Sequence, residues 1–398
     1  MIKTNVFIIG AGAAGLMCGI EAAKRGRNVV IIEHSNKPGK KILMSGGGRC
    51  NFTNYNASFD NYISNNQHFC KSALSQYTQW DFISLVEKYK LEYYEKTKGQ
   101  LFCKNKAKDL LSILLLECEK YKVELYNNTD VLDINFIKDN HFKIKTSKGD
   151  YHAESLVVAT GGLSIPTMGA SPFGYKVAEQ FNLKVLPTRA GLVPFTFTDN
   201  QKAKYSKLSG ISVEAIVNCN NAYFRENILF THRGISGPAI LQISSYWNPG
   251  NEIAIDILPD IDLEQDLLNK KKQTPEKQLK TILAEYLPKN LIKEFLDYEF
   301  NNLYLYNSLL KQLDLKHIQY THEVFKNWKI KPSGTEGYRT AEVTIGGVDV
   351  NQVSSKTMEV NSVKGLYFIG EVLDVTGWLG GYNFQWAWSS GWVAGQNV

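Results

Sequence analysis

A glycine-rich turn close to the start of the chain constrains the fold more than any other feature. The apolar run Val6–Ile9 passes directly into Gly-Ala-Gly-Ala-Ala-Gly at residues 10–15, and an alanine-rich helical pattern follows over residues 16–24. A second apolar run, Val29–Ile32, leads to Glu33. Short apolar runs of this kind are typical of buried strands. This order therefore predicts a strand–helix–strand unit with a tight turn after the first strand.

The glycines of this turn have separate roles in a Rossmann-like site. Gly10 permits a tight turn, Gly12 leaves room for a pyrophosphate, and Gly15 lets the helix pack closely on the sheet. The helix N-terminus adds unpaired N–H groups and a partial positive charge, which favour phosphate. Glu33 has the spacing of an acid that accepts hydrogen bonds from a ribose. The expected dinucleotide contacts are Gly10, Gly12, Ala13, Ala14, Gly15 and Glu33.

Two other interpretations fit this stretch less well. A glycine-rich turn of some other α/β protein would not need the helix, second strand and acid that follow. A secretory signal would explain Lys3 before an apolar run, but Glu21 and Lys24 interrupt that run and no small-residue cleavage site follows. We therefore expect no secretory signal, and no apolar run approaches the length of a membrane span.

The composition is that of an ordinary globular protein. The chain has 398 residues, 43% of them hydrophobic and 21% charged, which is enough for two or three domains. Its net charge of +6 is spread along the chain, and the basic cluster Lys270–Lys272 lies among acids. This pattern argues against a nucleic-acid partner, and nothing in it indicates the oligomeric state.

The cysteines indicate a reducing environment. Residues 18, 50, 70, 103, 118 and 219 are cysteines, and none of them forms a CxxC or CxxxxC pair. This spacing argues against a metal site and against a flavin-linked redox disulfide. We therefore expect a cytoplasmic protein without a bound metal.

A second glycine-rich stretch, Ser-Gly-Gly-Gly-Arg-Cys-Asn, follows the first unit. Three adjacent glycines would be costly in a regular element, so they predict a loop against a planar ligand or a phosphate. Arg49 can neutralise phosphate, and Asn51 offers both a donor and an acceptor. Cys50 is interpreted as a packing residue rather than a redox group, because no partner cysteine lies nearby. The candidate contacts in this loop are Ser45, Gly46, Gly47, Gly48, Arg49, Cys50 and Asn51.

Two later segments repeat the pattern of a buried strand that ends in glycine. Leu156–Ala159 runs into Thr160 and Gly161, a second place where the backbone can approach a cofactor and where two-domain flavoproteins leave the nucleotide fold. Residues 365–369 form another strand, which ends in Gly370 and Glu371. In two-part flavin sites such an acid binds a hydroxyl of the ribityl chain, so a flavin is the expected ligand.

The predicted C-terminal helix, residues 384–394, follows Gly380 and Gly381. If its N-terminus faced the flavin pyrimidine, it would favour the negative charge of reduced flavin. The alternative is a helix that simply packs on the sheet. The density of glycines and the matching N-terminal turn favour the first interpretation.

The middle of the chain has a different pattern. From Leu192 the apolar residues alternate, which predicts the strands of a barrel or small sheet, and residues 262–313 are helical and rich in lysine and glutamate. His232 lies among the strands; catalysis is one possible role, and a hydrogen-bonded structural histidine is the commoner one. Pro238 fits the start of a short helix, which either binds an anion or is capped by Ser236.

These segments together resemble the BaiN-like bacterial flavoproteins. This family is described in general terms as NAD(P)/FAD-dependent oxidoreductases and includes an aminoacetone oxidase and a bile-acid dehydro-reductase. The segments that carry the resemblance are residues 10–15, Lys40-Lys41, residues 45–51, Ala159–Gly162, residues 230–238, Gly346–Val348 and residues 365–385.

The resemblance implies an α/β fold with three parts. These are a two-segment, glutathione-reductase-like FAD-binding domain at 1–190 and 341–398, a β-barrel-like substrate domain at 191–259 and 318–340, and an inserted helical domain at 260–317. The further FAD contacts that it implies are Lys41, Val131, Ala159, Thr160, Gly161, Gly370, Glu371, Gly381, Tyr382 and Asn383.

The expected activity is hydride transfer between flavin N5 and a small organic substrate, with NAD(P)H as a transient donor. The chain has one dinucleotide fingerprint, which leaves no second Rossmann domain for a resident nicotinamide. The alternatives are an amine oxidase that uses oxygen, and a non-catalytic or RNA-associated flavoprotein, which the scattered charge makes the least favoured. Trp328 and Trp378 either line a substrate pocket or pack in a core. No catalytic base stands out, and the candidate polar groups are Tyr382, Asn383, His232 and Arg49.

Overall fold

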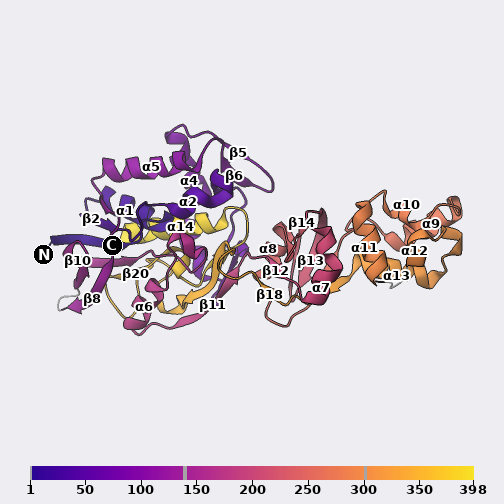
Figure 1. Ribbon diagram of the computed structural model, residues 1–398. Coiled ribbons are helices and arrows are strands. Elements are labelled where there is room, and N and C mark those ends of the chain that lie inside the picture. Colours follow the sequence, from indigo (N-terminus) through magenta and orange to yellow (C-terminus); the bar gives the residue numbers. More distant parts are fainter. Residues whose placement is uncertain (1, 138–140, 300–302) are drawn as a thin grey trace. The chain divides into compact units, whose positions relative to one another are not determined.

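The computed structural model describes residues 2–137, 141–299 and 303–398. The chain divides into two compact units, Met1–Arg189 with Val343–Val398, and Ala190–Glu342. The first unit contains a mainly parallel sheet between helices, and the second contains an antiparallel sheet and helices (Figure 1). The predicted α/β class is therefore confirmed, whereas the finer division into three domains stays a prediction.

Parallel strands form the centre of the first unit. They are β1 (Ile2–Ile9), β2 (Val29–Ile32), β7 (Glu124–Tyr126), β10 (Gly149–Val158) and β20 (Leu366–Phe368), and they pair in the order β7-β2-β1-β10-β20. The apolar residues of β1, β2 and β10 are buried almost without interruption. Continuous apolar strands of this kind are typical of parallel sheets covered on both faces.

Shorter strands and the helices complete the first unit. The strands β8 (Val131–Ile137) and β9 (His141–Thr146) continue the sheet antiparallel from β10. The smaller sheets are β3 (Asn51–Asn54) with β6 (Gln100–Cys103) and β5 (Tyr93–Glu95), β4 (Tyr62–Ile63) with β21 (Thr376–Gly377), and β11 (Val185–Gly191) with β19 (Val343–Val348). The helices are α1 (Ala13–Lys24), α2 (Lys40–Met44), α3 (Phe69–Gln76), α4 (Gln79–Lys88), α5 (Ala107–Lys120), α6 (Phe173–Gln180) and α14 (Tyr382–Asn397).

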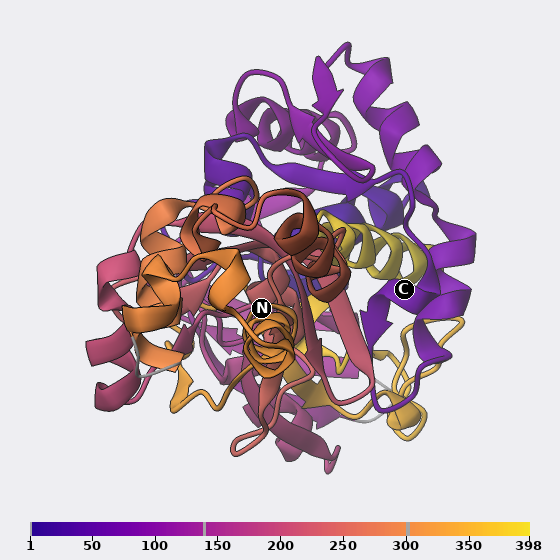
Figure 2. The ribbon, with the colours of Figure 1, turned by 90° about the vertical axis from the view of Figure 1, so that its right-hand side faces the viewer.

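The first and last helices of the chain, α1 and α14, pack directly against each other. In Figures 1 and 2 the yellow C-terminal helix lies among the indigo and purple segments of the N-terminal part. A Cβ atom on Gly391 would lie 2.5 Å from the carbonyl oxygen of Ala14, and one on Gly395 would lie 2.6 Å from Cβ of Glu21. Glycine at these two positions therefore permits the close approach of the helices. This contact joins the two chain segments that carry the predicted cofactor residues.

A buried carboxylate ties three helices of the first unit together. Glu117 of α5 is fully buried and accepts hydrogen bonds from Lys88 and from the Tyr89 hydroxyl, and its second oxygen lies 3.7 Å from Nζ of Lys24 in α1. Burial alone would raise the pKa of Glu117, but the hydrogen bonds from Lys88 and Tyr89 and the charge of Lys24 outweigh it. The pKa of this carboxyl is therefore lowered in the folded protein.

The Glu117→Gln variant is expected to be less stable at pH 7 by about 1–2 kcal/mol, because it leaves Lys88 without its anionic partner and Lys24 with Glu21 alone. A carboxyl group whose pKa is lowered by folding stabilises the folded state at pH values above its pKa in the unfolded chain. This stabilisation is lost as the pH falls through the pKa of the group in the folded protein. The wild type should therefore lose its advantage over the variant in acid. Urea unfolding at pH 7 and pH 4 measures this, with the exposed Glu119→Gln of the same helix as control. An equal loss in both variants would contradict the assignment.

The second unit is organised on an antiparallel sheet with a large aromatic core. Trp328 is buried there, its Nε1 donates to the hydroxyl of Tyr205 at 3.1 Å, and the rings of Phe230 and Phe295 contact it. Trp328 is thus a core residue. The sheet order is β17 (Trp328–Ile330), β16 (Ile253–Asp256), β13 (Ser212–Cys219), β14 (Ala222–Phe230), β15 (Gly234–Ser236), β12 (Phe195–Thr196) and β18 (Gly334–Thr335). The helices are α7 (Asp199–Tyr205), α8 (Pro238–Ser244), α9 (Leu263–Gln273), α10 (Leu279–Leu283), α11 (Lys289–Glu299), α12 (Leu303–Asn307) and α13 (Leu315–Lys326).

Candidate functional site

The parallel register of the first unit brings the predicted cofactor residues to one edge of the sheet. Ile9 lies opposite Ile32 on one side and opposite Val158 on the other, and Val158 lies opposite Phe368. The residues that follow these strand ends are Gly10, Glu33, Ala159 and, after one more residue, Gly370. Ligands of open α/β sheets bind at the carboxyl ends of the strands. The edge formed by these residues is therefore the candidate site.

The first glycine turn combines two tightly packed glycines with one open glycine. A Cβ atom on Gly10, whose φ is +108°, would lie 2.5 Å from the oxygen of Ala159, and one on Gly15 would lie 2.0 Å from the oxygen of Gly10. A Cβ atom on Gly12 would have no atom within 4 Å. Gly12 precedes α1 and provides no side-chain cap for it. The backbone at the helix N-terminus is therefore open to a phosphate, as the fingerprint predicts.

Glu33 is held in place by neighbouring backbone groups. Its Oε2 accepts a hydrogen bond from the N–H of Ala11 at 3.0 Å, and its Oε1 accepts one from the N–H of Ser35 at 2.8 Å. Nδ1 of His34 also lies 3.2 Å from Oε1. A carboxylate can accept about four hydrogen bonds, so Oε2 in particular retains capacity for a ligand. The N–H of Thr129 donates to the backbone oxygen of Glu33 at 3.0 Å, which brings the chain just before Val131 beside this acid.

The second glycine loop follows a short helix, α2, that the sequence did not predict. After α2, residues Gly46, Gly47 and Gly48 have φ angles of 57°, 66° and 84°, a left-handed backbone that favours glycine. A Cβ atom on Gly47 or Gly48 would have no atom within 4 Å. Arg49 is exposed, and the described residues include no ion-pair or hydrogen-bond partner for its guanidinium. This loop offers open backbone and a positive charge.

Two of the predicted contact residues, Asn51 and Cys50, stabilise the second glycine loop. Asn51, in the amide orientation that satisfies both polar atoms, donates to the oxygens of Thr53 (3.2 Å) and Leu101 (3.1 Å) and accepts from the N–H of Gly381 (3.1 Å). Cys50 is buried, and burial raises the pKa of its thiol, which favours the packing interpretation. Asn51 therefore connects the second glycine loop to the start of α14.

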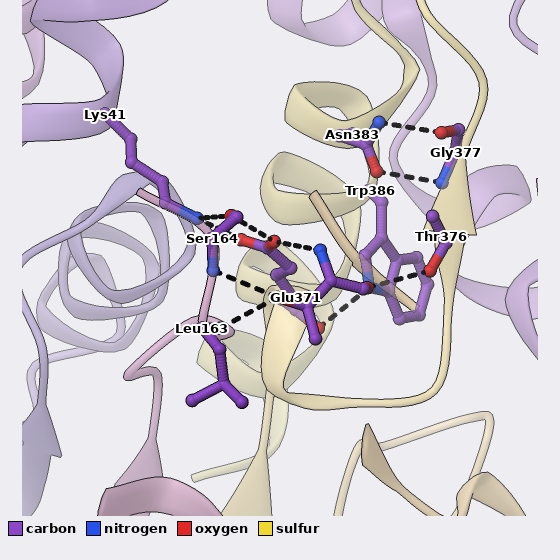
Figure 3. Close-up of polar contacts among 10 residues, drawn as sticks. Lys41, Leu163, Ser164, Glu371, Thr376, Gly377, Asn383 and Trp386 are labelled. Atoms are coloured by element: carbon purple, nitrogen blue, oxygen red, sulfur yellow. Dashed lines mark hydrogen bonds and ion pairs between the residues drawn. The ribbon is translucent and has the colours of Figure 1, made fainter. Parts of the chain in front are cut away.

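A charged network joins Lys41 to Glu371 across the site (Figure 3). Lys41 Nζ lies 2.7 Å from Oε2 of Glu371 and also donates to Oγ of Ser164 at 2.7 Å. Oε1 of Glu371 accepts from the N–H of Thr344 at 2.9 Å and from Ser164 Oγ at 3.2 Å. Oγ1 of Thr344 in turn accepts from the N–H groups of Leu163 and Ser164. The structure thus brings together two predicted residues and adds Ser164 and Thr344, which the sequence analysis missed.

The start of α14 is fixed by side chains that the sequence analysis considered for catalysis. The side-chain amide of Asn383 donates to the oxygen of Gly377 and accepts from the N–H of Gly377 (Figure 3). It also donates to the oxygen of Trp378. Tyr382 is buried, burial raises the pKa of its phenol, and its backbone oxygen accepts from the hydroxyl of Tyr62. The amide of Asn383 is therefore engaged in holding the loop before the helix.

The strand end at Ala159 and the turn at Gly370 complete the edge. Gly161 has a φ of +71°, and a Cβ atom there would lie 3.7 Å from Oε2 of Glu371. Gly370 has a φ of +73°, its N–H donates to Ser390 Oγ, and its oxygen accepts from Nε1 of Trp386. These backbone turns leave the Glu371 carboxylate beside the end of β10.

The remaining candidate, His232, belongs to the second unit. It is exposed in the turn between β14 and β15, where the N–H of Thr231 donates to the oxygen of Gly234. The helix that starts at Pro238 has no side-chain cap, so Ser236 does not cap it. The described part of the chain contains no group of His, Cys, Asp and Glu side chains that could hold a metal, and none of its helices is long and apolar enough to cross a membrane.

The first unit passes two tests of fit to a dinucleotide. The backbone is open at Gly12, Gly47 and Gly48, where no described atom would contact an added Cβ. The acid at the end of β2 retains acceptor capacity after its two backbone hydrogen bonds. Both features are what a pyrophosphate and a ribose require.

Comparison with known proteins identifies full-length relatives. The chain is 52% identical over 400 residues to the Escherichia coli (strain K12) protein named ribosomal RNA dihydrouridine synthase, covering 100% of this chain and 98% of the relative. It is 46% identical to the Haemophilus influenzae protein of the same name, covering 98% and 97% of the two chains. It is also 28% identical to the 3-dehydro-bile acid delta(4,6)-reductase of Clostridium scindens, covering 98% of each.

A solved structure supports the fold. The 3-ketosteroid-delta4-(5alpha)-dehydrogenase of Rhodococcus jostii RHA1 matches 99% of this chain and 97% of its own with a TM-score of 0.50 and 12% identity. At this level of identity the similarity concerns the fold alone.

These relatives correct two expectations from the sequence. The expected transfer of hydride to a small organic substrate and the argument against a nucleic-acid partner are both wrong, because the two relatives above 45% identity are named for action on ribosomal RNA. The error has a physical cause: the net charge of a chain and the distribution of charge along its sequence do not show whether charged side chains gather on one surface of the folded protein.

The predicted resemblance to the BaiN-like flavoproteins is confirmed, and the relatives are enzymes. The model of the HI0933-like protein Rossmann domain matches residues 4–397. The chain therefore belongs to the HI0933-like family of flavin-type oxidoreductases.

Proposed function

We propose that this chain reduces a uridine base of ribosomal RNA to 5,6-dihydrouridine, with FAD bound at the carboxyl edge of the parallel sheet. The observation that carries the proposal is the full-length similarity to two proteins named ribosomal RNA dihydrouridine synthase, at 52% and 46% identity. The proposal includes a cytoplasmic location, since bacterial ribosomal RNA is found there.

The site is proposed to hold FAD in two chain segments. The turn around Gly12 and the N-terminus of α1 bind the pyrophosphate, Glu33 binds the adenosine ribose, and Gly46–Gly48 lies against the flavin end. The paired Lys41 and Glu371 lie where the ribityl chain and its phosphate are expected. The other proposed contacts are those predicted from the sequence, namely Ala13, Ala14, Ser45, Arg49, Cys50, Asn51, Val131, Ala159, Thr160, Gly161, Gly370, Gly381, Tyr382 and Asn383.

The reaction adds a hydride and a proton across one double bond of uracil. When bound, reduced FAD would supply the hydride for C6 of the base, which can accept it because C6 is conjugated with the C4 carbonyl, and a proton would add to C5. NAD(P)H is the proposed electron donor that restores reduced FAD. The glycine loops leave backbone free to contact a planar ring.

The purified holoprotein, supplied with NADH or NADPH and ribosomal RNA transcribed in vitro, is expected to form dihydrouridine. Mass spectrometry of the digested RNA would show a nucleoside 2 mass units heavier than uridine, since two hydrogen atoms are added. RNA incubated without the protein, and with protein whose flavin has been removed, provides the controls. Flavin-loaded protein that is reduced by the donor but leaves every uridine unchanged, in naked RNA and in ribosomal subunits, would refute the proposal.

A further inference from the structure

An exposed surface of aromatic and basic side chains lies beside the second glycine loop of the first unit. We call it the hairpin surface and define it as Tyr55, Trp80, Lys96 and Lys98. Trp80, at the start of α4, is 56% exposed, and its ring stacks on that of Tyr55 with 5.4 Å between centroids. The two lysines are exposed near the tip of the hairpin formed by β5 and β6. None of these four residues belongs to the proposed FAD contacts.

Hydrogen bonds to backbone oxygens join the segment of the aromatic pair to the hairpin. The N–H of Tyr55 donates to the oxygen of Gly99 at 2.8 Å. The amide of Asn54 donates to the oxygen of Lys98 at 3.2 Å and to the oxygen of Gly380 at 2.9 Å. Gly380 directly precedes the glycine that starts α14. The hairpin surface is thus fixed to the loop at the start of this helix.

Phe102 connects the same hairpin to the second glycine loop. Nζ of Lys96 lies 5.5 Å from the ring centroid of Phe102, a distance typical of a cation–π contact. A Cβ atom on Gly46 would lie 2.8 Å from the same ring. Lys96 therefore lies close to the part of the site that is proposed to face the flavin ring.

The acids of the hairpin are already engaged. Glu95 accepts a hydrogen bond from the N–H of Gly99 at 3.0 Å, and Glu92 pairs with Lys104 at 3.3 Å. By contrast, Lys96 has no ion-pair partner among the residues that the structure describes. The hairpin surface therefore combines an available positive charge with an exposed tryptophan face.

We propose that the hairpin surface binds single-stranded RNA next to the target uridine, with a base stacked on Trp80 and phosphates contacted by Lys96 and Lys98. The inference rests on the proposed function, because it assigns a surface to the RNA substrate of that reaction. Single-stranded RNA is the occupant that fits, since its bases stack on aromatic rings and its phosphates attract lysine. A protein partner would require a broader apolar patch than one tryptophan and its stacked tyrosine.

The test uses the full-length holoprotein and labelled ribosomal RNA transcribed in vitro. Fluorescence anisotropy should show that Trp80→Ala binds this RNA roughly 5- to 150-fold more weakly, while Trp80→Phe retains most of the affinity. Lys96→Gln should reduce the slope of log affinity against log salt by about 0.7, the value for one phosphate contact on a single strand. Dihydrouridine formation by these variants should show a raised KM for RNA with little change in kcat.

Matched controls and flavin content separate a local effect from a damaged fold. Leu132→Ala, at a residue 60% exposed on β8, and Lys143→Gln, at an exposed residue on β9, should bind RNA as the wild type does. Every variant should keep its flavin absorbance. RNA binding by Trp80→Ala equal to that of the wild type, or the same loss in the controls, would overturn the hairpin assignment while leaving the proposed reaction intact. Binding that depends on Trp80 only in assembled ribosomal subunits would overturn it in favour of a protein contact.

If the wild type binds ribosomal RNA through Trp80 but forms no dihydrouridine, the proposed reaction fails and the binding surface stands. If the wild type binds no ribosomal RNA, the hairpin proposal fails outright. The two proposals therefore have distinguishable outcomes in the same set of measurements.

Discussion

The Gly12→Asp variant is expected to fold and to be purified without flavin. An added side chain at this position has open space, because no described atom lies within 4 Å of the Cβ site, and the φ of −82° is accessible to any residue. The carboxylate would instead occupy and repel the expected position of the pyrophosphate at the N-terminus of α1. The visible flavin absorbance of the purified protein should therefore fall by at least tenfold, while its far-ultraviolet circular dichroism stays unchanged.

Two further substitutions make this result specific. Gly12→Ala should retain a substantial fraction of the flavin, because a methyl group adds no charge. Gly10→Ala should instead damage the fold, since its Cβ atom would lie 2.5 Å from the oxygen of Ala159 and its φ is +108°. Full flavin content in Gly12→Asp would refute the assignment of this turn as the pyrophosphate site.

The Gly391→Ala variant is expected to lose about 2 kcal/mol or more of its free energy of unfolding. The new methyl group would lie 2.5 Å from the oxygen of Ala14 and 3.1 Å from Cβ of Met17, so α1 and α14 must separate. Overpacking of this kind costs about 1–3 kcal/mol or more, which exceeds the gain of up to about 1 kcal/mol from the better helix propensity of alanine. Because the N-terminus of α1 is part of the proposed pyrophosphate site, flavin affinity should fall as well.

Urea unfolding of the holoprotein and of the protein after flavin removal measures both effects. After flavin removal, Gly12→Ala is the matched control for stability, since it makes the same chemical change at a site where no described atom lies within 4 Å of the added methyl group. Gly395→Ala should behave like Gly391→Ala, because its Cβ atom would lie 2.6 Å from Cβ of Glu21. Wild-type stability in Gly391→Ala would show that the two helices do not depend on close contact at this position.

Local sequence patterns predicted the centre of the fold well. The strand at Val29–Ile32 has the predicted bounds, because a run of branched apolar residues between a helix end and an acid suits a buried parallel strand. The C-terminal strand is shorter than predicted and ends at Phe368, since Gly370 turns the chain with a φ of +73°. Helix α14 begins at Tyr382, two residues before the predicted start, directly after the left-handed Gly381.

Residues that act through distant partners were harder to predict. Lys41 came from a family resemblance and Glu371 from its place after a strand that ends in glycine, and their ion pair joins residues 330 positions apart. Ser164 and Thr344 complete this pair, yet neither belongs to a glycine motif or a periodic pattern that indicated a role. The hairpin surface that we propose for RNA was missed for a related reason: Trp80, Lys96 and Tyr55 come from separate segments of the chain, and they come together only after β3, β5 and β6 have paired.

The ion pair between Lys41 and Glu371 also has a consequence for protein synthesis. Ribosomes make the chain from its N-terminus, so the first glycine turn, the second glycine loop and the whole second unit are translated before Glu371 and α14 exist. A nascent chain can therefore form only part of the proposed cofactor site until Glu371 and α14 have been made. Flavin capture would then be a late event in the synthesis of this chain, and fragments that end before Glu371 would remain colourless.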